Sequence, residues 1–541
     1  MTPGLSPGAL IACALRLGAD RIAGWSAREA ALARMATEVR SGTVRRLHEQ
    51  IRSGEDPLGQ AFIELRPPAA RRELGATYTP AVIVNAMLAW AGGHVAPERV
   101  IDPGAGSGRF LLSAAGMFPE ATLIGVEIDP LAALIARANL AAAGLAGRSH
   151  IAVCDYREFP LRSSVRTLFI GNPPYVRHHL IEARWKDWLA QGWRALGIRA
   201  SRLAGLHVHF FLATLLGART GDAGAFITAA EWLDVNYGAA LRQGFLGDLG
   251  GQGIVAVEPA MTAFADAATT SAITLFRIGE RAPRVRLRRL KSIVDAASLE
   301  GGHLVSRQRL ERQSRWSQLL RGAGASSSAR SCSRKAPVAS GDLVELGELC
   351  RVHRGQATGA NEVWIAAAQE ACALPVNVLF PSVTRARELI SAGRVLRSLE
   401  RLRRVVDLPR DLDELESSAR RPIEVFLRAA RRRGAHRSYL ARHRRAWWSV
   451  ELRAPAPILA TYMARRPPAF TRNVAGARHL NIAHGLYPRV ALTEAQLMGL
   501  VDYLSTGVRV ADGRTYAGGL TKFEPREMER LLVPRPEVLP A

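Results

Sequence analysis

The residues best suited to chemistry are Asn172-Pro173-Pro174-Tyr175, which follow a short apolar run at 168–170. The two prolines remove two backbone donors and stiffen the loop, so the Pro173 carbonyl stays free to accept a hydrogen bond. This carbonyl and the Asn172 side-chain carbonyl could accept both hydrogens of a planar NH₂ group. Accepting both hydrogens favours a pyramidal nitrogen and directs its lone pair at an electrophile. Tyr175 offers a flat face on which a substrate ring could stack.

A glycine-rich turn lies upstream, where Gly104, Gly106 and Gly108 separate a predicted strand from a predicted helix. Their alternate spacing differs from the GxGxxG of dinucleotide enzymes, and no Lys-Ser or Lys-Thr follows as in a phosphate-binding P-loop. Such glycines let the backbone pass close to a ligand while the helix N-terminus faces it. Asp102 stands at the strand end before this turn. A carboxylate there suits a ligand with a cationic amine better than a pyrophosphate.

Two further predicted strands also end on carboxylates. Glu127, followed by Ile128, can accept hydrogen bonds from both hydroxyls of a ribose. Asp155, followed by Tyr156, could accept from the exocyclic amine of a purine. Carboxylates at three successive strand ends fit a nucleoside with an amino-acid tail. We therefore expect S-adenosylmethionine as the cofactor, bound by the glycine turn, the three carboxylates and the residues that follow Glu127 and Asp155. The alternative is that the carboxylates cap helices or turns and the glycines only make turns.

Short apolar runs alternate with amphipathic stretches across the middle of the chain. We expect strands at 100–101, 123–126, 151–154, 168–170, 225–227 and 271–276, and helices at 110–117, 131–143 and 208–216. Strands that alternate with helices at this spacing predict an α/β fold with a Rossmann-like, doubly wound parallel sheet. The candidate residues would then meet at one edge of this sheet. Upstream, helical periodicity is carried by Ile22, Trp25, Leu32, Met35 and Val39.

The charge is distributed unevenly along the 541 residues, which hold 73 Lys+Arg and 48 Asp+Glu for a net charge of +25. Residues 73–280 have 16 basic and 17 acidic side chains, whereas residues 281–541 have 46 and 24, a net charge of +22. A near-neutral middle followed by a basic end is typical of a catalytic module joined to a part that binds a polyanion. A hydrophobic content of 48% excludes a disordered or fibrous protein.

Targeting and metal signals are weak. No stretch is apolar and long enough to span a bilayer, and the N-terminus makes a poor secretory signal, so we expect a soluble, cytoplasmic protein. The five cysteines lack the paired spacing of a zinc site or a disulfide framework, and we expect no metal.

The glycine turn, the three carboxylates and the Asn-Pro-Pro-Tyr loop together resemble the amino-methyltransferases that use S-adenosylmethionine. The resemblance is closest to the adenine-N6-specific DNA methyltransferases of restriction-modification systems. The order is also similar to the group in which the cofactor half precedes the catalytic half and a recognition domain comes last. The resemblance implies methyl transfer to N6 of an adenine that is flipped out of duplex DNA.

The same resemblance extends the candidate site. Residues 75–80 (GATYTP) are similar to the segment that closes over the methionine part of the cofactor, so Thr77, Tyr78 and Pro80 are expected to contact it. Residues 263–266 (AFAD) resemble the place of a second aromatic against the flipped adenine, which makes Phe264 the candidate, although an apolar Phe is more often core.

We expect four parts: a helical segment over 1–72, a catalytic domain over 73–320, a linker over 321–336 and a mixed α+β DNA target-recognition domain over 337–541. The linker is small, polar and basic. Residues 346–348, 354–361, 473–488 and 520–534 resemble parts of the family's recognition domains. Residues 420–445 place arginines beside Tyr439, Trp447 and Trp448, a mixture suited to phosphate contacts and to stacking against bases. The alternative is a solvated helix face.

Other functions stay open at this point. They are methylation of a release-factor glutamine, methylation of an RNA base, and DNA binding by a catalytically inactive relative. The common restriction-nuclease site needs a lysine two residues after an acidic one, but here the residues two before each lysine are Arg184, Arg289, Ser333 and Leu520. We therefore expect a monomeric, stand-alone modification enzyme. The alternatives of a separate restriction endonuclease, a variant nuclease or a partner subunit stay open.

Overall fold

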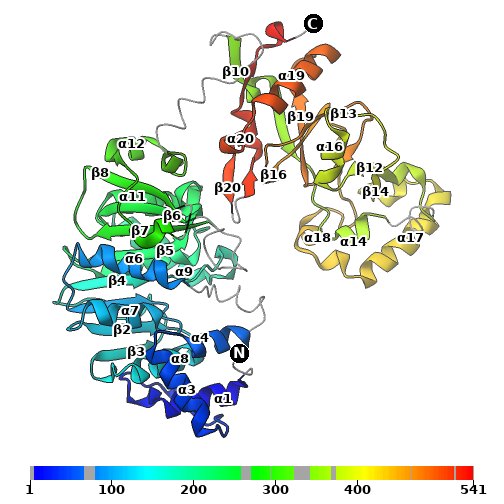
Figure 1. Cartoon of the computed structure of the whole chain (residues 1–541). Coiled ribbons are helices and arrows are strands. Elements are labelled where there is room, and N and C mark those ends of the chain that lie inside the picture. Colours follow the sequence, from blue (N-terminus) through cyan, green and yellow to red (C-terminus); the bar gives the residue numbers. More distant parts are fainter. Residues whose placement is uncertain are drawn as a thin grey trace. The chain divides into compact units, whose positions relative to one another are not determined.

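The structure is a computed structural model that describes residues 5–65, 79–257, 270–290, 292, 294–321, 342–366, 373–464, 466–516 and 520–539 (Figure 1). The chain divides into two compact units, here called the N-terminal and C-terminal units, with the division between Ser327 and Ser328. The predicted linker over 321–336 lies almost wholly outside the described residues, as do Thr77, Tyr78 and Phe264. Each unit has its own hydrophobic core.

The N-terminal unit is built on one nine-stranded sheet with the order β3-β2-β1-β4-β5-β7-β6-β8-β9. The strands are β1 (Arg99–Pro103), β2 (Thr122–Glu127), β3 (Ser149–Val153), β4 (Thr167–Gly171), β5 (Ala223–Ala229), β6 (Gly251–Val257), β7 (Ser271–Arg277), β8 (Arg284–Leu290) and β9 (His303–Ser306). The first five are parallel, and β7 runs antiparallel between β5 and β6. The sheet predicted from the sequence is confirmed.

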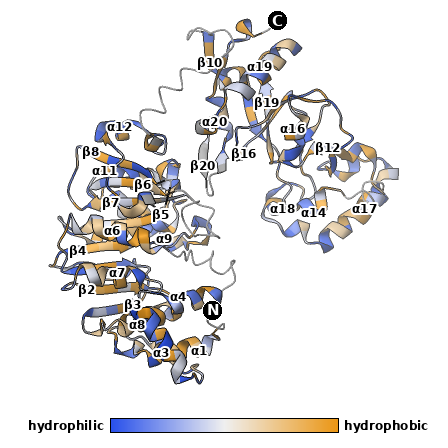
Figure 2. Ribbon diagram, viewed as in Figure 1, coloured by the Kyte–Doolittle hydropathy of each residue, from blue (hydrophilic) through white to orange (hydrophobic). Residues whose placement is uncertain are grey.

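Helices cover both faces of this sheet. One face carries α6 (Ala81–Gly92), α7 (Arg109–Met117) and α8 (Pro130–Ala142), and the other carries α9 (Ala183–Ala195), α10 (Leu206–Gly217), α11 (Ala239–Leu246) and α12 (Arg307–Arg312). Strand side chains alternate between the two cores, as Leu168 and Ile170 pack on the first and Phe169 on the second. Figure 2 shows β4 and α6 as largely hydrophobic, as expected for elements buried in the unit. Within the described parts of the chain, no helix is long and apolar enough to cross a membrane.

Three strands of this sheet, β6, β8 and β9, were not predicted from the sequence. β6 begins with Gly251-Gln252-Gly253, which shortens its apolar run, and β8 alternates arginines with buried apolar residues. β8 lies second from the sheet edge, between β6 and β9, and its arginines make it read as a polar segment in the sequence. The sheet therefore extends further than the apolar runs indicate.

The N-terminal segment is helical, but four of the five residues whose spacing indicated a helix lie outside its helices. It folds as α1 (Pro7–Arg16), α2 (Ala27–Ala33), α3 (Ser41–Arg52) and α4 (Pro57–Glu64). Of the five residues taken as periodic, only Leu32 is helical, and Met35 is 61% exposed. Gly24 interrupts the chain with a φ of 92°, which ends one helical stretch before the next begins. The segment packs on α8 through a shared apolar cluster, so it forms part of the N-terminal unit.

The C-terminal unit is mixed α+β, as predicted. Its main sheet has the order β11 (Cys350–Arg354), β19 (Ala483–Pro488), β15 (Ile458–Thr461), β17 (Phe470–Asn473) and β13 (Val395–Leu396). Smaller sheets join β14 (Arg403–Val406), β12 (Leu379–Val383) and β18 (Arg478–His479); β16 (Met463–Ala464), β21 (Leu520–Lys522) and β20 (Arg514–Tyr516); and β10 (Leu343–Glu345) with β22 (Leu532–Pro534). Its helices are α13 (Leu346–Leu349), α14 (Asn361–Trp364), α16 (Ala386–Ala392), α17 (Ser417–Arg432), α18 (Tyr439–His443), α19 (Glu494–Gly507) and α20 (Pro525–Glu529).

Candidate active site of a methyltransferase

The carboxyl ends of the parallel strands bring the predicted residues to one edge of the sheet. Asp102 lies in β1 next to its end, Glu127 ends β2, Asp155 follows β3 by two residues and Asn172 follows β4 directly. The parallel pairing of β1 with β2 and β4, and of β2 with β3, aligns these four ends. The edge is where ligands bind in open α/β sheets.

Asp102 is the most unusual group at this edge. Its side chain is 1% exposed, and neither carboxylate oxygen has a hydrogen-bond partner among the described residues. Burial raises the pKa of Asp102 well above its ordinary value, and the nearby Glu127 carboxylate raises it further. A buried carboxylate without a donor is costly, so its retention points to a cationic group that binds there.

The glycine turn and the catalytic loop lie against each other at Asp102. A Cβ atom added to Gly171 would lie 2.3 Å from Oδ1 of Asp102, and one added to Gly104 would lie 3.4 Å from Cδ of Pro174. The backbone that leads into Asn172 therefore passes directly over the Asp102 carboxylate. A ligand that pairs with Asp102 would therefore lie beside the loop that could activate an amine.

This contact predicts the effect of Gly171→Ala. The added methyl group should displace the buried Asp102 carboxylate and weaken cofactor binding by about tenfold or more, because a charge-assisted hydrogen bond tolerates little misplacement. Titration calorimetry with S-adenosylmethionine measures this. Gly116→Ala is the matched control, since Gly116 lies in α7 with nothing within 4 Å of an added Cβ atom. Equal affinities in the two variants would show that the Gly171 contact is unimportant.

Glu127 is held firmly by the backbone around it. Its Oε1 accepts from the N–H groups of Ile128 at 2.8 Å and Asp129 at 2.9 Å, and its Oε2 accepts from Gly106 at 2.9 Å. Burial raises the pKa of Glu127 and these backbone donors lower it, with a net upward shift. Oε2 keeps capacity for a second donor. Beside it, the apolar residue Ile128 is 52% exposed, as a flat ring packing on it would require.

The glycine turn uses left-handed backbone at three alternate positions. Gly104, Gly106 and Gly108 have φ values of 76°, 54° and 82°, which side-chain-bearing residues rarely adopt. An added Cβ atom on Gly106 would meet nothing within 4 Å, whereas one on Gly108 would lie 3.3 Å from Ala136 of α8. Gly106 thus faces open space at the site, and Gly108 lets α7 and α8 pack closely.

Asn172 is oriented by a residue that the sequence-based reasoning did not select. Its Nδ2 donates to Oγ1 of Thr79 at 3.1 Å, and Thr79 is 4% exposed. In this orientation the NH₂ end of the amide faces Thr79 and the carbonyl end faces away from it. Pro80, predicted to contact the cofactor, immediately precedes α6 as its N-cap residue.

Tyr175 is the second positioned group of the loop. Its hydroxyl lies 3.5 Å from Oγ of Ser271, the first residue of β7, and burial raises the pKa of Tyr175. The phenol therefore stays neutral, so it could offer a ring face to a ligand but is a poor base. Pro173 is buried and Pro174 is half-buried, so the loop between the two functional side chains is packed.

The Asp155 carboxylate is held mainly by hydrogen bonds from Arg157. Oδ1 of Asp155 accepts from the backbone N–H and Nε of Arg157, each at 2.9 Å, and Oδ2 accepts from a terminal nitrogen at 2.5 Å. Burial raises the pKa of Asp155, but these bonds bring it below its ordinary value. A carboxylate has about four acceptor positions, so one remains for a ligand amine.

The Tyr156 side chain belongs to the core. It is 2% exposed, its hydroxyl shares a 2.8 Å hydrogen bond with Oγ1 of Thr214, and its ring stacks on Phe210. An aromatic ring with a satisfied hydroxyl is well suited to burial. The structure therefore does not bring the Tyr156 hydroxyl to the strand-end edge, and a ligand contact by this residue stays a prediction.

Family comparison covers both units. Residues 60–199 match the family described as N-6 DNA Methylase, and residues 330–540 match the C-terminal domain of the Type II methyltransferase M.Eco57I. Over 487 residues the chain is 53% identical to the Type II methyltransferase M.XamI of Xanthomonas campestris pv. amaranthicola, with 90% of this chain and 88% of the relative covered. The chain belongs to the Type II adenine-N6 DNA methyltransferases.

Two further similarities agree with this membership. The Type II methyltransferase M.AccI of Acinetobacter calcoaceticus is 22% identical, with 85% of each chain covered. The solved structure of the Type IIL restriction-modification enzyme MmeI in complex with DNA has a TM-score of 0.56 at 13% identity, covers 87% of this methyltransferase and 70% of that chain, and shows the fold alone. The 487-residue match to M.XamI extends into the C-terminal unit, so glutamine or RNA methylation is not favoured.

The C-terminal unit of the methyltransferase presents a basic surface around α17. One side of this helix buries Ala419, Ile423, Phe426, Leu427 and Ala430, and Figure 2 shows the alternation of hydrophobic and hydrophilic residues along it. Several exposed arginines of residues 417–445 form no ion pair with a carboxylate of the described residues, among them Arg421, Arg428, Arg432, Arg437, Arg442 and Arg445. Unpaired surface cations are what a phosphate backbone neutralises.

The aromatic residues of this region have different roles. Trp447 packs against Trp364 and Trp448, and Nε1 of Trp448 donates to the Pro409 carbonyl at 3.0 Å. These two tryptophans were expected to stack or wedge against bases, but both are half-buried and serve the core of the unit. Tyr439 is 70% exposed and is the aromatic of the predicted set that is available to a partner.

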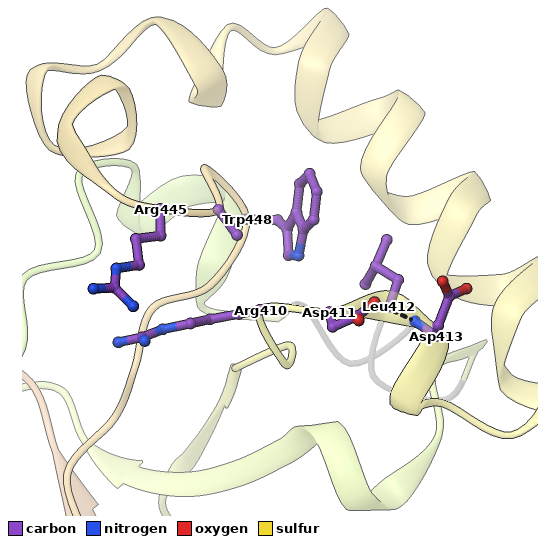
Figure 3. Close-up of a pocket in the computed structure, with 7 residues that line it drawn as sticks. Arg410, Asp411, Leu412, Asp413, Arg445 and Trp448 are labelled. Carbon is purple, nitrogen blue, oxygen red and sulfur yellow. Dashed lines mark hydrogen bonds between the residues drawn. The ribbon is translucent and has the colours of Figure 1, made fainter.

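A shallow depression of about 510 Å³ lies beside these tryptophans. Figure 3 shows Arg410 and Arg445 extending toward one end of it, Asp411 and Asp413 lining the other and Trp448 between them. Arg410 makes a two-point ion pair with Glu451, whereas Arg445 makes none with the carboxylates that the structure describes. The arginine end of the depression continues the basic surface of α17.

Proposed function

We propose that this methyltransferase transfers a methyl group from S-adenosylmethionine to N6 of an adenine flipped out of duplex DNA, as the modification enzyme of a restriction-modification system. The observation that carries the proposal is the close approach of Gly171 to Asp102. It places the amine-activating loop beside a buried carboxylate that lacks a donor. Membership of the family supports adenine in DNA as the methyl acceptor, and the residues of the site support S-adenosylmethionine as the methyl donor.

The residues of the strand-end edge fit this cofactor. Asp102 would pair with the amine of its methionine part, and Thr77, Tyr78 and Pro80 would contact the same part. Glu127 would accept from the ribose hydroxyls. Further contacts with S-adenosylmethionine are proposed for Gly104, Gly106, Gly108, Ile128, Asp155 and Tyr156. When bound, S-adenosylmethionine supplies a methyl group that its sulfonium makes electrophilic.

The catalytic loop would prepare the acceptor nitrogen. The side-chain carbonyl of Asn172 and the backbone carbonyl of Pro173 would accept the two hydrogens of the adenine NH₂ group, while Pro174 keeps the loop rigid. Tyr175 and Phe264 would stack on the two faces of the flipped base. Stacking offsets the cost of unpairing and unstacking, which is on the order of a few kcal/mol.

A direct test of the acceptor uses isotope-labelled S-adenosylmethionine with three substrates: duplex DNA, transfer RNA and a release factor. Nucleoside mass spectrometry should find the label in N6-methyladenine from DNA. Label in N4-methylcytosine, in RNA or in protein glutamine would contradict the proposal. The Asn172→Ala variant serves as the background control for each substrate.

The basic surface of α17 is proposed to hold the phosphate backbone. Arg428 and Arg432 are four residues apart on this helix, so they lie on the same face. Both are exposed and form no ion pair with a carboxylate in the part of the chain that the structure describes. Because phosphate contacts position DNA without reading its sequence, these arginines should set affinity and salt dependence rather than the methylated sequence.

The double variant Arg428→Ala/Arg432→Ala should bind duplex DNA about tenfold more weakly near 0.1 M salt, with a log–log salt slope smaller by about 2. Fluorescence anisotropy over a salt series measures both quantities. Arg420→Ala is the matched control, because Arg420 is exposed on the same helix but pairs with Asp413 at 2.8 Å. An unchanged slope in the double variant would remove α17 from the DNA interface.

A further inference from the structure

Asp56 is a buried carboxylate that the proposed chemistry does not use. It caps α4, where its Oδ1 accepts from the Gly59 N–H at 2.9 Å, and it is 4% exposed. Its position before Pro57 explains the helix start, since Asp is a favoured N-cap and Pro a favoured first residue. A cap of this kind is normally solvated, so its burial needs another cause.

The cause is a set of contacts to the glycine turn. Oγ of Ser107 donates to Oδ2 of Asp56 at 2.5 Å. Nδ2 of Asn139, on α8, donates both to Oδ1 of Asp56 at 3.1 Å and to the backbone carbonyl of Ser107 at 2.9 Å. Arg109, the first residue of α7, lies 3.7 Å from the same carboxylate. One residue of the N-terminal segment thus contacts the turn, α7 and α8.

Ser107 is placed where such an anchor has most effect. It lies between Gly106 and Gly108, both of which have left-handed backbone and few intrinsic constraints. The N–H of Gly106 in turn donates to Glu127, the residue proposed to hold the ribose. Fixing Ser107 therefore fixes the peptide that carries a cofactor contact.

The N-terminal segment provides a rigid base for this anchor. Arg137 of α8 is fully buried and donates to the backbone carbonyls of Ile22, Ala23 and Gly24 and to the Glu29 carboxylate. The Ile22–Gly24 backbone is also paired with the sheet edge, because Ala23 bridges to His150. The segment is therefore attached to α8 and β3 by hydrogen bonds that do not involve Asp56. Asp56 is thus held on one side by the fold and on the other by the turn.

We propose that Asp56 is a positioning residue for the cofactor: it holds the Gly104–Gly108 turn, through Ser107 and Asn139, in the conformation that binds S-adenosylmethionine. The inference rests on the proposed function, since it assumes that this turn binds that cofactor. Asp56 lies before residue 60, where the match to the N-6 DNA Methylase family begins. The N-terminal helices then belong to the catalytic machinery and are more than a lead-in to it.

Ser107→Ala is the sharpest variant, because it removes the hydroxyl and leaves the cap of α4 intact. Loss of this hydrogen bond to a buried charge should loosen the turn, and we expect the affinity for S-adenosylmethionine to fall about tenfold. The KM for the cofactor should rise by a similar factor, with kcat at saturating cofactor nearly unchanged. Asp56→Asn, which keeps a capping oxygen but removes the charge, should give a comparable loss.

The double variant Ser107→Ala/Asp56→Asn separates a shared contact from two separate defects. Its affinity should be within about twofold of the weaker single variant, since neighbours in one network are not additive. Ser6→Ala is the matched control, because Ser6 caps α1 through the Ala9 N–H and should leave affinity unchanged. Losses that multiply in the double variant, or wild-type affinity in Ser107→Ala, would overturn the role of Asp56. Absence of S-adenosylmethionine binding by the unsubstituted protein would instead overturn the proposed function.

Discussion

Asn172→Ala should lower kcat for methyl transfer by about 10³-fold while changing the dissociation constants of cofactor and DNA by less than about threefold. The reason is that the amide oxygen of Asn172 is proposed to accept a hydrogen bond from the reacting NH₂ group. This hydrogen bond should be strongest in the transition state, when the nitrogen lone pair attacks the methyl group. The Asn172 side chain bonds to Thr79 and not to the Asp102 carboxylate. Its removal should therefore leave the cofactor pocket intact.

Rapid-quench single-turnover kinetics with a duplex substrate measure this effect on the chemical step. Asn172→Asp is the conservative control: a carboxylate still accepts hydrogen bonds, and the Thr79 hydroxyl can donate to it, so part of the rate should return. An Asn172→Ala enzyme with a wild-type single-turnover rate would rule out activation of the amine by this side chain.

Asp102→Asn is expected to have the largest effect on cofactor binding. Replacing the buried carboxylate by a neutral amide removes its attraction for a cationic amine, and removing one partner of a buried ion pair costs about 3–5 kcal/mol, or at least 100-fold in affinity. Calorimetric titration with S-adenosylmethionine measures the loss. Retention of wild-type affinity would show that Asp102 does not hold the cofactor's amine.

The same variant should unfold at a higher temperature when no cofactor is bound. Burial raises the pKa of Asp102 well above its ordinary value, with Glu127 adding to the shift. A carboxyl with a raised pKa stabilises the fold while it is protonated, and this contribution is lost as the pH rises through the raised pKa. Asn stays neutral throughout, so its advantage should grow from acidic to neutral pH, to about 2–4 °C in Tm.

Cofactor affinity of the unsubstituted enzyme should show the opposite trend. The cationic amine favours the ionised carboxylate, so binding should strengthen as the pH rises through the raised pKa of Asp102. Asp102→Asn should lose this part of the pH dependence. Affinity that is independent of pH in the unsubstituted enzyme would contradict the assignment.

The sheet and the strand-end carboxylates were predictable because they depend on local patterns. The apolar residues of β4 form an uninterrupted run that only a buried strand accommodates, and Glu127 follows a similar run in β2. Parallel pairing then aligns the strand ends without further information. The strand β8, which lies next to the edge strand β9, has arginines between its apolar residues, so it carries no uninterrupted apolar run and was missed.

The supporting contacts were not predictable, because they join residues that are distant in sequence. Thr79 meets Asn172 across 93 residues and Asp56 meets Ser107 across 51. Neither Thr79 nor Asp56 differs by type from ordinary turn and capping residues. The one local signal, Asp56 followed by Pro57, indicates a helix start and nothing about the turn that it contacts.

Charge and aromatic content predicted the basic surface of the C-terminal unit but not its details. The excess of arginine appears on α17 as exposed side chains, of which Arg428 and Arg432 form no ion pair with any described carboxylate. Trp447 and Trp448, in contrast, complete the core around α17. A sequence run of cations and aromatics does not reveal which rings a helix buries.

The central claim, adenine-N6 methylation of DNA by the Asn172 loop, is tested most directly by methylation-sensitive sequencing of genomic DNA from a host that expresses this chain. The account predicts N6-methyladenine at one defined sequence in cells with the unsubstituted enzyme, and none at that sequence in cells with Asn172→Ala. Genomic DNA without new N6-methyladenine, or with the same methylation in both strains, would contradict it.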